Sequence, residues 1–163
     1  MGKYDCLKKY VNVSNRKADT NSFYLINVDE IEESKKRIEV NFSEELKEFW
    51  LEIGYGFFRS TSSEVGITQI DYSNRLLPPD DIVSILTEGA DSGIITEQGL
   101  KFLKEGEIPI FEIADFTSYL IMKPNSDHPN AVYTTRGQII EESLEQFIWK
   151  LYHVSPTYYL DKY

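Results

Sequence analysis

The chain has 163 residues, and its hydrophobic fraction of 41% and aromatic fraction of 13% predict one folded domain and exclude a disordered chain. Its 27 acidic residues outnumber its 17 basic residues, and the net charge of −10 argues against direct nucleic-acid binding because an acidic surface repels phosphate. Cys6 is the single cysteine, which leaves no intramolecular disulfide. The sequence also lacks a signal peptide and the ~20-residue apolar run that crosses a bilayer. We therefore expect a cytoplasmic protein that does not bind membranes.

Negative charge is concentrated after residue 40. Residues 1–40 contain 8 basic and 7 acidic residues, for a net charge of +1. Residues 41–163 contain 9 basic and 20 acidic residues, for a net charge of −11. Such a body attracts a basic partner and speeds the encounter with it. The alternative interpretation is that the acidity only keeps the protein soluble.

The beginning of the chain is predicted to differ from the rest. Residues 1–28 are polar and mixed in charge, and we expect an N-terminal arm or extension with an edge strand or packed segment in the apolar run 23–28. The domain proper is predicted over residues 29–163. Its first helix covers residues 29–40, with acids first and bases last, as the helix dipole favours.

Residues 41–56, NFSEELKEFWLEIGYG, predict the clearest helix. Ser43 is a suitable N-cap, and Gly54 can take the backbone conformation that ends a helix. Four apolar residues fall on one helical face: Leu46, Phe49, Trp50 and Ile53. Strands are predicted to begin at Phe57 and to cover residues 66–72.

The second half of the chain predicts two more helices, four strands and a closing helix. The helices cover residues 79–88, ended by Gly89, and residues 96–106. The strands are 108–113, 118–122, 131–134 and 138–140, with Arg136-Gly137 as the last hairpin turn. The closing helix starts at a capping box formed by Ser143 and Gln146. These elements predict the α+β class, a single domain with a central, mostly antiparallel β-sheet flanked by helices.

The sequence shows no catalytic or metal-binding pattern. His128 and His153 stand apart, and no HxxE, HExxH or CxxC spacing occurs, so surface or packed histidines are favoured over metal ligands. Glu112 and Asp115 would be the acid–base candidates. Glu112, however, is predicted to face solvent from an alternating strand, and Asp115 to form a turn. We therefore predict a protein that is not an enzyme and has neither metal nor cofactor.

Four segments, in order, resemble the signature of the SMI1/KNR4 (SUKH) superfamily, and together they cover residues 29–152. They are the helix pair that ends at Gly54-Tyr55-Gly56, Leu77-Pro78 followed by acids, the run IPIFEIAD at 108–115, and the closing helix of residues 140–151. The resemblance implies a central β-sheet flanked by helices.

This resemblance also implies a function. Bacterial members of the superfamily are largely immunity proteins of polymorphic or contact-dependent toxin systems, which bind and neutralise a cognate toxin domain, often a nuclease, without catalysis. Fungal members are regulators that bind several partners, so a general protein-binding module of the SMI1/KNR4 type is the alternative function. The acidic, tyrosine-rich composition suits a basic nuclease domain.

Partner-binding residues are predicted among the acids that follow residue 70 and on the closing helix. They are Asp71, Tyr72, Asp80, Asp81, Glu88, Asp91 and Trp149. The acids would attract a basic partner if they form one exposed patch, and the alternative is a solvated loop region. Trp149 lies beside the apolar face of its helix, which makes it a candidate contact residue.

Overall fold

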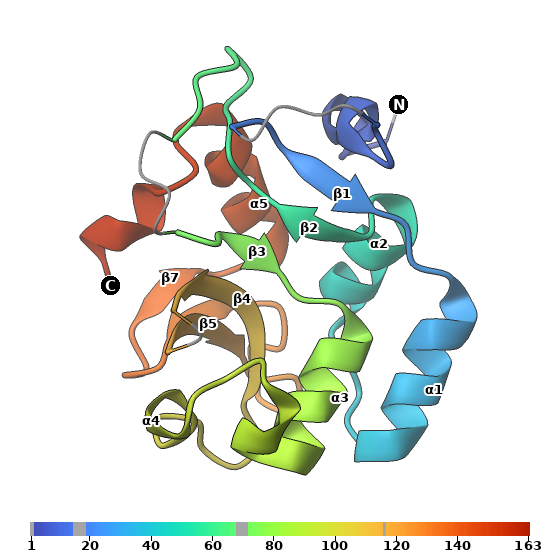
Figure 1. The fold of residues 1–163 in the computed structure, drawn as a ribbon, viewed down its shortest axis with the longest axis vertical. Helices are drawn as coiled ribbons and strands as arrows, with labels where there is room; N and C mark the ends of the chain where they lie inside the picture. Colours follow the sequence, from blue (N-terminus) through green and yellow to red (C-terminus); the bar gives the residue numbers. More distant parts are fainter. Residues whose placement is uncertain (1, 15–18, 68–71, 116) are drawn as a thin grey trace.

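The computed structural model describes residues 2–14, 19–67, 72–115 and 117–163. It confirms the predicted α+β class. The described residues form one seven-stranded sheet in which every strand pairs antiparallel with its neighbour in chain order (Figure 1). The strands are β1 (Ser22–Tyr24), β2 (Tyr55–Phe57), β3 (Arg75–Leu76), β4 (Ile108–Ala114), β5 (Ser118–Met122), β6 (Val132–Thr134) and β7 (Ile139–Glu141).

The predicted helices all form. The α-helices are α1 (Val28–Ile38), α2 (Glu44–Glu52), α3 (Pro79–Glu88), α4 (Glu97–Leu100) and α5 (Leu144–His153), and three short 3-10 helices are η1 (Asp5–Tyr10), η2 (Gly89–Ser92) and η3 (Tyr158–Asp161). The predicted N-caps are confirmed, because the hydroxyl of Ser43 accepts from the Leu46 backbone N–H and that of Ser143 from the Gln146 backbone N–H. α4 ends at Leu100, six residues earlier than predicted, and Lys101 follows as its C-cap.

The strands before β4 differ from the prediction. β2 begins at Tyr55 rather than Phe57, because the chain turns directly from α2 into the sheet through Gly54. The predicted strand 66–72 falls partly on residues 68–71, which lie outside the described residues. Gly66 forms an isolated bridge with Ser60, and the strand that pairs with β2 is β3.

A continuous series of aromatic contacts forms the core. The four residues of the predicted α2 face, Leu46, Phe49, Trp50 and Ile53, are fully buried. The rings of Phe49, Phe23 and Phe58 contact one another and connect α2 to β1 and the segment after β2, and Phe58 continues the series to Phe111 on β4. Phe111 contacts Phe147 of α5 with ring centroids 5.2 Å apart. The core therefore joins helices and strands from the whole chain.

Glu112 does not face solvent, and that prediction is wrong. The alternation of β4 places it on the face opposite Phe111, but that face is also covered, and Glu112 is buried among residues of α3 and the segment after it, including Ile85 and Ile95. Its Oε1 lies 3.9 Å from Nε of Arg75, its cross-strand partner. Its Oε2 has no hydrogen-bond partner among the described residues. Glu112 is thus a buried carboxyl group, while Asp115 adopts the predicted turn.

Both ends of the chain pack against this core. Tyr4, Leu7 and Tyr10 of the N-terminal segment are buried, and the Tyr4 ring contacts Phe49 edge-on at 4.9 Å. The aromatic tail folds back, and Tyr159 is fully buried with its hydroxyl donating to the side chain of Asn74. The division of the chain at residue 28 stays a prediction, and the described part of residues 1–28 packs on the body of the domain.

Two glycines allow β1 to lie against β2. A Cβ atom added to Gly54 would overlap the Tyr24 carbonyl oxygen, and one added to Gly56 would overlap the Ser22 carbonyl oxygen. Both residues have positive φ angles, 104° and 149°. Residues with side chains would therefore push β1 off the edge of the sheet.

We predict that Gly54→Ala destabilises the fold by about 3 kcal/mol or more, because the clash with backbone atoms adds to the strain of a positive φ. Gly106→Ala is the matched control. It also has a positive φ, but its Cβ would meet no described heavy atom within 4 Å, so only about 1–2 kcal/mol is expected. Urea unfolding of both variants measures the difference, and equal losses would contradict the role given to the close approach.

A second prediction concerns pH. Burial raises the pKa of Glu112 above its ordinary value, with smaller opposing effects of Ser73 and Arg75. The folded state therefore holds this proton more tightly than the unfolded state, and stability is lost as pH rises from the unfolded pKa through the higher folded one. Glu112→Gln should remove that loss, so its advantage over the wild type should grow across this pH window and then level off.

Urea unfolding at several pH values measures this advantage. The exposed Glu105→Gln is the matched control and should show no such trend. A difference between Glu112→Gln and the wild type that does not vary with pH would contradict the prediction.

Candidate functional site

The structure engages two of the predicted acids in contacts within the fold. Asp81 forms an ion pair with Arg75, with an N–O distance of 2.9 Å, and only 16% of the Arg75 side chain is exposed. Asp80 is exposed, and its carboxylate accepts a hydrogen bond of 3.3 Å from Ser34 of α1. Both acids also stand in the first turn of α3, where the helix dipole favours negative charge. These contacts give both residues a structural role.

The other predicted residues lie elsewhere. Glu88 and Asp91 are exposed at the far end of α3 and in η2, about 12 Å along the helix from Asp80. Tyr72 is half-buried against the core. Asp71 lies outside the described residues. The acids therefore do not gather around one point, and their part in partner binding stays a prediction.

Trp149 points outward from α5. Its side chain is 57% exposed, as predicted, and its ring contacts that of His153 one turn later at 4.7 Å. α5 lies in the upper half of the view along the long axis, whereas α4 lies near the lower end (Figure 1). The structure thus separates Trp149 from Glu88 and Asp91, although the sequence analysis grouped them as one set.

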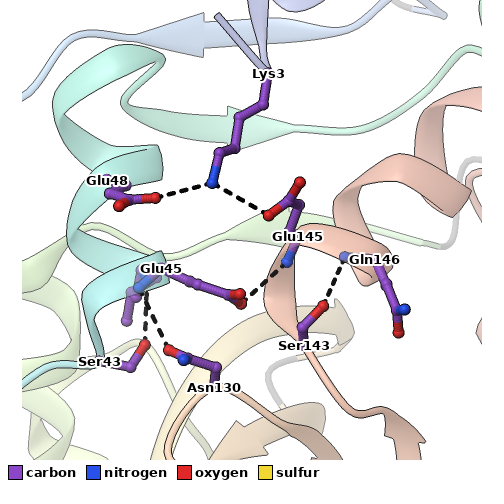
Figure 2. A network of polar contacts seen from close by, with 9 residues as sticks. Lys3, Ser43, Glu45, Glu48, Asn130, Ser143, Glu145 and Gln146 are labelled. Atoms are coloured by element: carbon purple, nitrogen blue, oxygen red, sulfur yellow. Dashed lines mark hydrogen bonds and ion pairs between the residues drawn. The ribbon is translucent and has the colours of Figure 1, made fainter.

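Near Trp149, the N-terminal segment meets α2 and α5 in a network of charged groups, which we call the α2–α5 junction. The Lys3 ammonium bridges the carboxylates of Glu48 on α2 and Glu145 on α5, at 3.2 and 3.1 Å (Figure 2). The Glu45 carboxylate accepts from the Glu145 backbone N–H at 3.3 Å, and the Asn130 side chain accepts from the Glu45 backbone N–H at 3.3 Å. The first turns of both helices are therefore capped across the junction.

A shallow groove of ≈40 Å³ separates η1 from α5 beside this junction. Its walls include Tyr4, Cys6, Leu7, Ile148, Trp149 and Tyr152. Apolar and aromatic surface predominates there, and the charged groups of Lys3 and Glu145 stand at its rim. A concave surface of this size suits the side chain of a binding partner better than a small-molecule substrate, which needs a larger pocket.

Carboxylates lie near Tyr4, one of the residues that line the groove. Burial raises the pKa of the Tyr4 hydroxyl above its ordinary value, and four glutamates of α2 and α5 raise it further. They are Glu145, Glu45, Glu48 and Glu52. The same hydroxyl has no hydrogen-bond partner among the described residues. Glutamates of α2 and α5 are therefore concentrated around Tyr4, and the Lys3 ammonium pairs with two of them, Glu48 and Glu145.

The described residues were compared with the requirements for metal binding, membrane spanning and nucleophilic catalysis. Within them, no group of three or more His, Cys, Asp or Glu side chains could hold a metal ion, and no helix is long and apolar enough to cross a membrane. His128 and His153 are exposed, which agrees with the surface role predicted for them. Partial burial raises the pKa of the Cys6 thiol, which is opposite to the shift that activates a nucleophilic cysteine.

The groove was not predicted, because residues 1–28 were expected to form an arm or extension. The spacing of the apolar residues in this segment does contain a signal. Tyr4, Leu7 and Tyr10 recur every third residue, the period of a 3-10 helix, and all three are buried. That spacing identifies an inward face, although it does not say which helices the face covers.

We predict that Asp81→Asn destabilises the fold by about 1–3 kcal/mol, because the largely buried Arg75 guanidinium loses its close carboxylate partner. Asp91→Asn is the matched control, since Asp91 is exposed and should change stability by less than about 0.5 kcal/mol. Thermal or urea unfolding of both variants gives the comparison. Equal stability of the two variants would show that Asp81 has no structural role.

Comparison with known proteins gives one relative to report. The chain is 28% identical over 141 residues to immunity protein YxxD of Bacillus subtilis (strain 168), and the alignment covers 86% of this chain and 89% of that protein. No protein-family model matches the chain, and no solved structure matches it. The resemblance to the SMI1/KNR4 superfamily therefore stays a prediction, while the similarity to an immunity protein is shown over most of the domain.

Proposed function

We propose that the protein is an immunity protein that binds a cognate toxin domain and neutralises it without catalysis. The observation that carries this proposal is the similarity to immunity protein YxxD, which extends over 86% of the chain and so is not confined to one motif. The resemblance of four segments to the SMI1/KNR4 superfamily supports the same function. The sheet flanked by helices is the architecture that this resemblance implies.

The charge of the chain supports a basic toxin. The net charge of −10 would speed association with a basic domain and would repel nucleic acid. A nuclease domain fits this requirement, because it carries a basic groove for its own substrate. The only acid–base candidates that the sequence offered give little support to an enzyme, since Glu112 is buried beside Arg75 and Asp115 forms a turn.

Co-expression tests the proposal. We expect a toxin domain to be encoded next to the gene of this chain, and this domain is induced in a bacterial host, either alone or together with this protein. We expect the protein to restore colony counts to those of uninduced cells. An unrelated acidic protein of similar size is the control, because it separates specific neutralisation from a general effect of charge. Absence of both protection and binding would overturn the proposed function.

A second measurement separates binding from catalysis. Toxin is recovered from the purified complex in denaturant, refolded and assayed. We expect its mass to be unchanged and its activity to return, because a binding protein leaves its target chemically intact. A toxin that returns with an altered mass and without activity would instead make this protein an enzyme.

A further inference from the structure

The outward face of α5 has an apolar surface that the fold does not use. Trp149 of α5 is 57% exposed, as is Val154, the C-cap residue after the helix, whereas five residues of α5 are buried. One face of the Trp149 ring contacts the ring of His153, and the rest is exposed to solvent. The Tyr152 ring contacts the same histidine ring, with ring centroids 5.0 Å apart. Exposed tryptophan is unusual in a protein without a partner and is enriched at the centres of protein interfaces. Its stacked position limits the rotamer freedom that binding would remove.

The groove between η1 and α5 lies next to this tryptophan and has an acidic rim. Lys3 and Glu145 line the groove, and the Lys3 ammonium bridges the carboxylates of Glu145 and Glu48 at 3.1 and 3.2 Å. Two carboxylates therefore share one ammonium group, which leaves a net charge of −1 on these three side chains.

The exposed tryptophan, the groove and the acidic rim together favour one class of binding partner over the others. A second copy of the chain carries the same acidic rim and the same net charge of −10, so self-association here would bring like charges together. A nucleic acid would meet the same repulsion. A basic protein would pair with the rim carboxylates and could place an apolar side chain in the groove beside Trp149. The Lys3 ammonium already makes, within the chain, the contact that a lysine or arginine of the partner would make.

We propose that Trp149, the groove between η1 and α5, and the acidic rim formed by Glu48 and Glu145 are the surface that binds the basic toxin domain. This inference rests on the proposed function and names the site where it acts. Trp149 supplies the buried anchor of the interface, and the rim carboxylates speed and orient the approach of the toxin.

Aromatic substitutions test the anchor. The probe is the toxin domain encoded next to the gene of this chain, and its association is measured by calorimetry or surface plasmon resonance. Trp149→Ala should weaken binding by about 30-fold or more, mainly through faster dissociation, as expected for a central tryptophan. Trp149→Tyr should recover part of that loss. Phe102→Ala is the matched control, because Phe102 is 46% exposed, follows α4 in the chain and does not line the groove, and we expect a change below about twofold.

Charge reversals test the rim. Glu48→Lys and Glu88→Lys change the net charge equally, and both residues are exposed, but only Glu48 lies at the α2–α5 junction. Glu48→Lys should slow association about tenfold at low salt and reduce its salt dependence, whereas Glu88→Lys should slow it less than about threefold. Circular dichroism of each variant establishes that the fold is retained.

The outcomes separate the two proposals. If the wild type does not bind the toxin domain, the proposed function and this surface both fail. If the wild type binds and Trp149→Ala and Glu48→Lys bind as well as their controls, the surface is wrong and the function stands. If Trp149→Ala instead abolishes a dimer of the wild type seen in sedimentation, the occupant is a second copy and the proposed toxin surface is overturned.

Discussion

The close approach of β1 to Gly54 and Gly56 is the constraint on which the rest of the structure depends. These two residues have no side chain where the carbonyl oxygens of Tyr24 and Ser22 lie, and this allows β1 to add an edge to the sheet. The segment that precedes β1 lies against α2 and α5, where Tyr4 contacts Phe49 and Lys3 pairs with Glu48 and Glu145. This segment also forms one wall of the groove. The strand that the two glycines admit to the sheet and the segment that lines the proposed partner surface are therefore neighbours in the sequence.

The aromatic core fixes the same arrangement from the inside. Tyr4 contacts Phe49, and from Phe49 the ring contacts continue through Phe23, Phe58 and Phe111 to the tail residue Tyr159. The two ends of the chain are therefore connected through one cluster. Asn74 secures the tail further, because its amide donates to the carbonyl oxygens of Phe58 and Pro156 while it accepts from Tyr159. Loss of packing at one end of the chain would therefore also weaken the packing of the other end.

Local signals made much of the fold predictable. The caps of α2 and α5 and the apolar face of α2 depend on residues within a few positions of each other, and the structure confirms them. What failed depends on distant contacts. Glu112 alternates as predicted, yet α3 covers its face of the sheet, and the N-terminal residues meet α2 and α5 across more than 40 positions of sequence. No local pattern contains those partners.

The same distinction applies to the predicted site. Asp80 and Asp81 were chosen for their charge, but the structure engages them with Ser34 and Arg75, which the sequence did not connect to them. Trp149 was identified correctly as an exposed residue, because its position beside the apolar face of α5 determines its exposure. Helix periodicity therefore located the anchor of the proposed surface, whereas the charged rim required the folded chain.

The surplus negative charge at the α2–α5 junction is stable because of where the helices begin. Glu45 and Glu145 lie in the first turns of α2 and α5, where the positive ends of the helix dipoles offset their repulsion. Lys3 then neutralises part of the remaining charge. The helix dipoles thus offset the charges of Glu45 and Glu145, and the Lys3 ammonium offsets those of Glu48 and Glu145. A surface of this kind is organised before binding, so the free energy of association is not spent on assembling it.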